Sequence, residues 1–172
     1  MPVSDGADPS DAAARAALEK FRQSGIRIDR EGAFWHEGAL IEHPRIVATF
    51  RRWLDRLPPP DGRHVLRLDD TRYVYVDCDD APLLARSLRW DGDRAWLMLA
   101  GGDELELDYA KIRLDPARGG AAYAAAQGRP RLEVRLAPQA WSQLCERVSE
   151  AEGGAGGPVL DAHGQRWPIS LR

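Results

Sequence analysis

The segment Trp35-His36-Glu37 contains side chains suited to bind a small ligand. An indole ring can stack on a nucleobase and an imidazole can donate an N–H, while the guanidinium of Arg45 can pair with a phosphate. Tyr73 and Tyr75 are two residues apart in a predicted strand, so their side chains lie on the same side of it. The candidate ligand-binding residues are therefore Trp35, His36, Arg45, Tyr73 and Tyr75.

The same side chains also fit a purely structural interpretation. In that case Trp35 packs on a helix, His36 caps a turn, and the two tyrosines belong to the core. Nearby arginines are equally ambiguous, because a basic helix face serves either an acidic partner or the solvent. These arginines are Arg45, Arg51, Arg52 and Arg56. Both interpretations stay open at the level of sequence.

Patterns typical of metal binding and catalysis are absent from the sequence. The four histidines form no His-x-His or i, i+4 pair, so we expect no metal site. The acidic run at 77–80 lacks a calcium-binding loop and is interpreted as a solvated strand edge. There is no Gly-x-Ser-x-Gly motif and no phosphate-binding glycine loop, and Cys78 and Cys145 lack a redox spacing. We therefore expect a non-enzymatic protein without a cofactor.

Composition limits the class of protein further. The 172 residues carry a net charge of −3 with a pI near 5.8, which argues against general nucleic-acid binding. No apolar stretch approaches the roughly 18 residues that a membrane span requires, and the first residues are polar and acidic. A chain with 44% hydrophobic residues can bury a core without metals or disulfides. The expected location is the cytoplasm.

Several elements must position the candidate residues. Residues 1–24 are expected to form a disordered tail and a short helix. Residues 25–80 contain a hairpin and then a helix that starts at Pro44, where a proline loses no hydrogen bond. The buried stripe of that helix is predicted to consist of Phe50, Trp53, Leu54 and Leu57. Three consecutive prolines from Pro58 end it.

The same pattern occurs again in the last third of the chain. A helix predicted from Pro138 to Glu150 carries apolar residues at the same spacing, namely Trp141, Leu144, Cys145 and Val148. The sequence therefore predicts an α+β fold in which a strand, helix and β-hairpin unit is duplicated around a mostly antiparallel meander. The units are 25–80 and 116–172, and the meander is 81–115. A chance likeness of two common segments is the alternative. Neither unit can bury its own apolar face, so a cleft is expected between them.

The segment from Ile28 to Gly38 reads Ile-Asp-Arg-Glu-Gly-Ala-Phe-Trp-His-Glu-Gly, which resembles the signature of a bacterial family, domain of unknown function 1285. Stretches at 79–82, 101–105 and 132–136 resemble later parts of that family in the same order. The resemblance implies a duplicated α+β core whose C-terminal half, 81–115 with 116–172, is superficially like a pleckstrin-homology fold. It also implies a role in signal transduction and a nucleotide-like ligand between the halves.

We therefore expect a ligand-sensing or regulatory protein whose site lies between the two repeats. A protein–protein interaction module and a small enzyme with an unrecognised site are the alternatives. A pocket at the repeat interface would favour the sensor, and an exposed apolar patch the interaction module. Perturbed titratable groups in one cleft would favour the enzyme. A protein partner and a homodimer both stay open.

Overall fold

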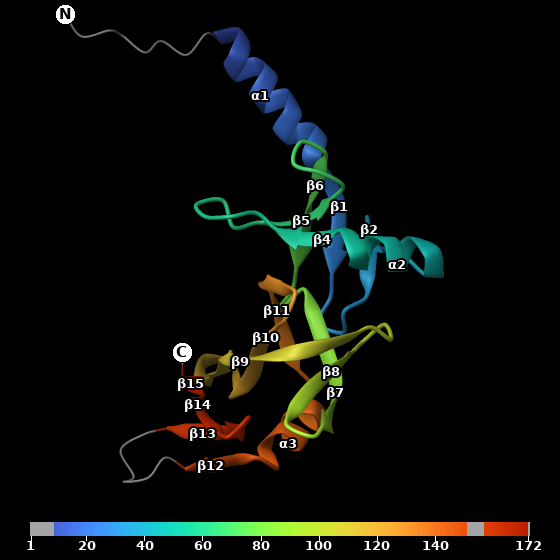
Figure 1. Ribbon diagram of the computed structural model, residues 1–172. Coiled ribbons are helices and arrows are strands. Elements are labelled where there is room, and N and C mark those ends of the chain that lie inside the picture. Colours follow the sequence, from blue (N-terminus) through green and yellow to red (C-terminus); the bar gives the residue numbers. More distant parts are fainter. Residues whose placement is uncertain (1–8, 151–156, 172) are drawn as a thin grey trace, which may run out of the picture.

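The computed structural model describes residues 9–150 and 157–171, which form an N-terminal and a C-terminal lobe (Figure 1). The tail expected to be disordered, residues 1–9, lies outside the described residues except for Pro9, which begins the first helix. The fold is α+β, as the sequence predicts. None of the helices in the described part of the chain is both long and apolar enough to cross a membrane.

The N-terminal lobe is one six-stranded sheet with two helices. Its strands lie in the order β3-β2-β1-β6-β5-β4, and only the β1–β6 pair is parallel. The elements are α1 (Pro9–Arg22), β1 (Gln23–Ile28), β2 (Phe34–His36), β3 (Ala39–Leu40), α2 (Pro44–Trp53), β4 (Leu54–Arg56), β5 (His64–Arg67) and β6 (Tyr73–Cys78). Helix α2 covers one face of this sheet, where the rings of Phe34 and Phe50 meet edge to face at 5.5 Å.

The C-terminal lobe contains a barrel. Strands β10-β11-β7-β8-β9 lie side by side, and an additional β9–β10 pairing closes them, with β15 added outside β9. The elements are β7 (Leu83–Asp91), β8 (Arg94–Leu99), β9 (Glu104–Asp115), the 3-10 turn η1 (Pro116–Arg118), β10 (Ala121–Ala126), β11 (Arg129–Leu136), α3 (Pro138–Cys145), β12 (Val148–Glu150), β13 (Pro158–Ala162), β14 (Gln165–Pro168) and β15 (Ser170–Leu171). The barrel thus combines the expected meander with the start of the expected second unit.

The two helices that start at prolines are shorter than the apolar spacing predicts. Helix α2 ends at Trp53, because Leu54 turns to extended backbone (φ −61°, ψ 125°) and pairs with Leu66 in β5. Leu54 and Leu57 are both buried, but in two different clusters and not on one helical stripe. Helix α3 likewise ends at Cys145, before β12 begins. A strand that can pair with a sheet edge outweighs helical spacing of the apolar residues.

The two expected repeat units do share an element order. Each consists of a helix that starts at a proline, followed by a three-stranded antiparallel meander, β4-β5-β6 after α2 and β12-β13-β14 after α3. Leu54 pairs with Leu66 in the first meander, as Val148 pairs with Leu160 in the second. Between the second and third strands, the register of the two meanders differs by one residue. Duplication and pleckstrin-homology likeness remain predictions.

One buried apolar cluster runs through both lobes and includes Ile28 and Phe34 in the first and Leu97 and Leu160 in the second. Polar contacts also cross the boundary. Arg51 donates from Nη2 to the carbonyl of Ala100 at 2.6 Å, against Gly101, where a Cβ would meet that guanidinium at 1.9 Å. The lobes therefore form one packed body.

Candidate functional site

Trp35, the first candidate residue, is held by the turn of the signature segment. Its Nε1 donates to Oδ2 of Asp29 at 2.7 Å, while Oδ1 accepts the backbone N–H groups of Glu31 and Ala33, each at 2.9 Å. Burial alone would raise the pKa of Asp29, but these hydrogen bonds outweigh it and lower that pKa. Gly32 in the same turn has φ +78°, which favours glycine. The signature therefore has a structural role in folding this hairpin.

The turn makes stability depend on pH. Asp29→Ala is expected to lower the free energy of unfolding by about 1–2 kcal/mol near pH 7, because three donors lose a charged acceptor. Since the folded-state pKa of Asp29 is lowered, its contribution is present above the unfolded pKa near 4 and is lost as pH falls through the folded pKa. Urea unfolding near pH 7 and near pH 2 should therefore show a large and then a small difference from wild type. Glu31→Ala, in the same turn, is the control, and an equal loss at both pH values would contradict this assignment.

The other candidate residues do not gather around Trp35. The ladder places Trp35 beside Arg27 and Asp77, on the face of the sheet that also carries Tyr73 and Tyr75. Arg45 belongs to α2, which covers the opposite face, and its side chain is exposed. His36 is exposed at the end of β2. The structure brings the two tyrosines together, but not with Trp35, His36 or Arg45.

The rings of the two tyrosines are already covered by arginines. Tyr73 and Tyr75 meet edge to face at 5.8 Å, with Arg22 3.9 Å from the centre of the first ring and Arg63 3.7 Å from that of the second. The Tyr75 hydroxyl donates to Glu19 at 2.7 Å. Burial raises the pKa of Tyr75 to about 12, and the hydrogen bond to Glu19 adds to this effect. This cluster fastens α1 to the sheet and leaves little ring surface for a base.

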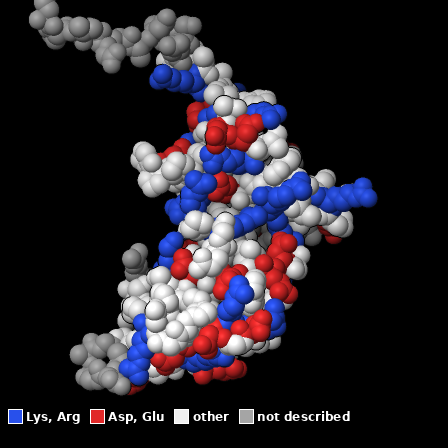
Figure 2. Space-filling view, in the orientation of Figure 1, with Lys and Arg blue, Asp and Glu red and all other residues white. Residues whose placement is uncertain are grey.

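A cavity with an excess of positive charge lies elsewhere, at the boundary of the lobes. Figure 2 shows Lys and Arg side chains gathered around the narrow waist of the molecule. A cavity of about 260 Å³ opens there between the end of α2, strands β4 and β5, and the β10–β11 hairpin. Its charged lining consists of Arg52, Arg67, Arg129, Arg131 and a single carboxylate, Asp55. The remaining wall includes Trp53 and Gly128.

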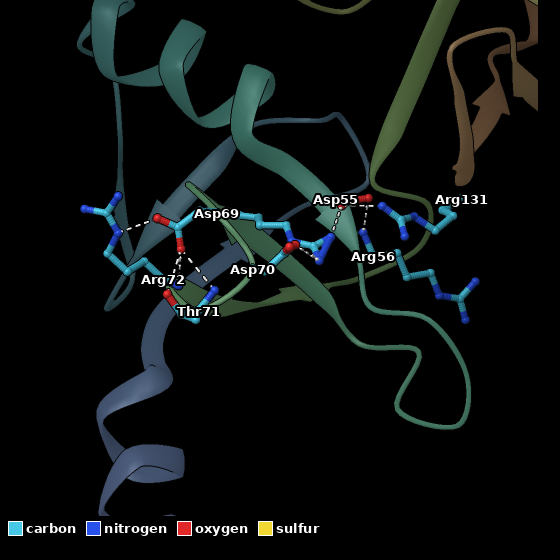
Figure 3. Close-up of polar contacts among 8 residues, drawn as sticks. Asp55, Arg56, Asp69, Asp70, Thr71, Arg72 and Arg131 are labelled. Carbon is cyan, nitrogen blue, oxygen red and sulfur yellow. Dashed lines mark hydrogen bonds and ion pairs between the residues drawn. The ribbon is translucent and has the colours of Figure 1, made fainter.

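Three of these arginines are held in place. Oδ2 of Asp55 accepts from Arg67 Nη1 at 2.9 Å and, across the lobe boundary, from Arg131 Nη2 at 2.7 Å (Figure 3). Arg129 Nη1 donates to the carbonyls of Arg51 at 2.8 Å and Leu54 at 3.3 Å. The cavity therefore keeps an excess of positive charge over one carboxylate, on side chains that are positioned before any ligand arrives.

Arg52 differs from the other three arginines. It is exposed on α2, and its side chain makes no hydrogen bond or ion pair with any residue in the described ranges. We refer to Arg52, Arg67, Arg129 and Arg131, with Asp55, as the arginine pocket. Such a set can bind a small anion by charge-assisted hydrogen bonds, and arginine forks suit phosphate and carboxylate oxygens.

Sequence reasoning included Arg52 only as part of a helix face and missed the other three arginines. Arg129 and Arg131 flank Pro130 in a stretch with no recognisable motif. Arg56, expected to share the helix face of Arg45 and Arg52, lies on β4 instead. The available signal was the run of basic residues after Gly128, which becomes meaningful only once the β10–β11 hairpin is known to meet α2.

The acidic run at 77–80 and the two cysteines contribute to ion pairs and packing within the fold. Asp79 pairs with Arg27, and Asp80 is mostly buried among arginines of the barrel instead of facing solvent. Among the described residues no group of histidine, cysteine, aspartate and glutamate could hold a metal ion. Burial raises the pKa of the Cys78 thiol to about 12, and burial also raises that of Cys145. Both thiols are therefore protonated at neutral pH.

Two solved structures share this fold. A DUF1285 family protein from Silicibacter pomeroyi DSS-3 is 23% identical, with a TM-score of 0.68 over 85% of this chain and 79% of that one. A DUF1285 family protein from Shewanella baltica OS155 is 16% identical, with a TM-score of 0.59 over 73% of this chain and 93% of that one. No family model and no curated protein matches the sequence. The resemblance to DUF1285 proteins is thus confirmed at the level of the fold.

Proposed function

We propose that this protein is a non-enzymatic, cytoplasmic sensor that binds a small phosphate-bearing ligand, nucleotide-like in its chemistry, in the arginine pocket. The observation that carries the proposal is the composition of that pocket, in which four arginines face one carboxylate. The pocket lies between the segments 25–80 and 116–172, where clefts between packed units form binding sites.

A nucleotide consists of phosphate, sugar and base, and the pocket has side chains suited to the phosphate and to the base. Arg52 and Arg131 are exposed and can meet phosphate oxygens, while Arg67 and Arg129 are less exposed and are held by hydrogen bonds within the protein. The indole of Trp53 forms one wall, where a base can stack for about 1–3 kcal/mol. Gly128 leaves open space beside its Cα, so a ligand can approach the backbone closely.

A binding role also agrees with the chemistry of the lining. The residues that form the arginine pocket in the described part of the chain include no serine, threonine, cysteine or histidine that could act as a nucleophile or base. Arginine stays protonated at any pH in which the protein is folded. We also propose that the two units arose by internal duplication. At this site a helix from one unit meets a hairpin from the other, as expected if neither unit can bury its own apolar face.

Thermal unfolding with a panel of ligands tests the proposal. The panel contains inorganic phosphate, AMP, ATP, GMP and a cyclic dinucleotide, with adenosine as the uncharged control. A ligand at 100 times its dissociation constant adds about 2.7 kcal/mol, which raises the melting temperature of a chain of this size by roughly 5–10 °C. The shift should fall with added salt, because it depends on charge.

Two variants of α2 locate the site. Arg52→Ala should weaken binding at least tenfold, whereas Arg45→Ala removes the same charge from the other end of the helix and should leave binding unchanged. Both side chains are exposed, so neither change should disturb the fold. If Arg45→Ala abolishes the shift and Arg52→Ala does not, the site instead lies around Arg45, at the start of α2. A flat panel for every phosphate compound contradicts the proposal.

A further inference from the structure

Of the three α-helices in the described part of the chain, α1 has the most exposed side chains. All its side chains from Ala12 to Leu18 are exposed, and only Glu19 and Arg22 are half-buried against the sheet. In Figure 1 the helix projects away from the N-terminal lobe. A helix of this length is only marginally stable in water without tertiary packing.

The helix nevertheless has an apolar stripe. Ala14, Leu18 and Phe21 are spaced four and three residues apart, so they lie on one face. The exposed fraction is 80% for Phe21 and 47% for Leu18. Exposing a large aromatic ring to this extent is unfavourable, and it points to a partner that covers the stripe.

The stripe continues into an open apolar groove. This cavity of about 630 Å³ lies between the end of α1, the end of α2 and the β5–β6 hairpin. Its lining includes Leu18 and Phe21 from α1, Phe50 and Trp53 from α2, and Leu68, which follows β5. Six large hydrophobic residues are exposed in the described ranges, and three of them, Leu18, Phe21 and Leu68, border this groove. The exposed apolar surface is therefore concentrated at one place.

We infer that a second copy of this chain covers the groove, with the α1 helices of the two copies packed side by side. In a two-fold interface each copy contributes the same patch. We call the apolar stripe of α1 together with the adjoining apolar groove the α1 groove surface. It suits two-fold symmetry, because it combines a protruding apolar helix with an adjoining apolar hollow. Each helix can lie over the hollow of the other copy.

The size of the surface sets the expected affinity. A helix of fourteen residues is about 21 Å long and 10–12 Å across, so one face and the adjoining groove offer several hundred Å². Two-fold symmetry uses this area twice, which approaches the roughly 1,200 Å² at the lower end of stable interfaces. We therefore expect a dimer with a dissociation constant of about 1–100 µM. The inference does not depend on the ligand proposed for the arginine pocket.

Sedimentation velocity of the full chain from about 1 to 300 µM tests the inference. Wild type should shift from monomer to dimer over this range, and Phe21→Ser should stay monomeric. Leu171→Ser is the matched control, because Leu171 is 61% exposed but lies outside the groove, so this variant should still form dimers. Phe21→Ser should keep the melting temperature of the dilute wild type, since the ring is hardly buried within one copy.

A disulfide trap tests which face of α1 is used. Ala14→Cys lies on the stripe, whereas Ala16→Cys lies on the other side of the helix, about 200° away. Under mild oxidation at concentrations where wild type is dimeric, Ala14→Cys should form linked dimers at least tenfold faster than Ala16→Cys. Cys78 and Cys145 are replaced by serine in both variants to remove other thiols.

Four results would overturn the inference. A wild-type protein that is monomeric at the highest concentration excludes the second copy. A dimer that survives Phe21→Ser uses another surface. Equal trapping at Ala14→Cys and Ala16→Cys would show that the stripe is not at the interface. A monomer that binds the apolar probe 1-anilinonaphthalene-8-sulfonate, and loses this binding in Phe21→Ser, would identify the groove as a small-molecule site instead.

Discussion

Replacing Phe34 with alanine is expected to lower the free energy of unfolding by about 3–5 kcal/mol. The side chain is 2% exposed, on the face of the sheet that α2 covers. Its ring packs edge to face on Phe50, which adds about 0.5–1.5 kcal/mol beyond the burial of apolar area. The loss is measured by urea unfolding followed by tryptophan fluorescence, with the same slope in both proteins.

The chain supplies a matched control for this change. Phe21→Ala removes the same atoms from a ring that is 80% exposed, so a dilute monomer should lose less than about 0.5 kcal/mol. Comparing the two losses in unfolding free energy separates the effect of burial from that of residue type. A loss below about 1 kcal/mol for Phe34→Ala would mean that α2 does not pack on the sheet as described.

Asp80→Ala is expected to lower the free energy of unfolding by about 2–3 kcal/mol. The side chain is 7% exposed, accepts hydrogen bonds from Arg118 and from the Tyr123 hydroxyl at 2.7 Å, and forms an ion pair with Arg135 Nη1 at 3.2 Å. Removing one member of a buried charged network costs about 3–5 kcal/mol, because the partners stay behind without compensation. The partial exposure of Arg118 and Arg135, 54% and 32%, reduces that figure.

Asp79→Ala is the control for Asp80→Ala. Asp79 is the adjacent carboxylate and pairs with Arg27, but both side chains are substantially exposed, at 36% and 41%. An ion pair of this kind contributes about 0–1 kcal/mol. Chemical unfolding of the two variants in parallel should give clearly different midpoints. Equal losses would contradict the burial assigned to Asp80.

Local patterns in the sequence predicted a large part of this fold. Pro44 and Pro138 both begin helices, as expected from a residue without an N–H. The alternation around Tyr73 and Tyr75 predicted a strand, and both residues lie on β6. The signature from Ile28 to Gly38 pointed to proteins that share this fold. Each of these signals depends on residues that are close in sequence.

Features that depend on residues far apart in the sequence could not be predicted from local patterns. The end of α2 at Trp53 depends on Leu54 finding a partner in β5. Asp80 resembled a solvent-exposed carboxylate because its partners, Arg118 and Arg135, are far along the chain. The arginine pocket requires Arg131 to reach Asp55, which is 76 residues away in sequence. Trp53, predicted to lie in the middle of a buried stripe, is half-buried between the arginine pocket and the α1 groove surface.

The buried cluster shared by both lobes has a consequence for cooperativity. Although Figure 1 shows two lobes, their apolar side chains belong to one contiguous set, so neither lobe can lose its packing without exposing the other. The protein should therefore melt as a single calorimetric unit, with equal calorimetric and van't Hoff enthalpies. Any molecule that binds in one lobe then protects the whole chain, including strands far from the point of contact.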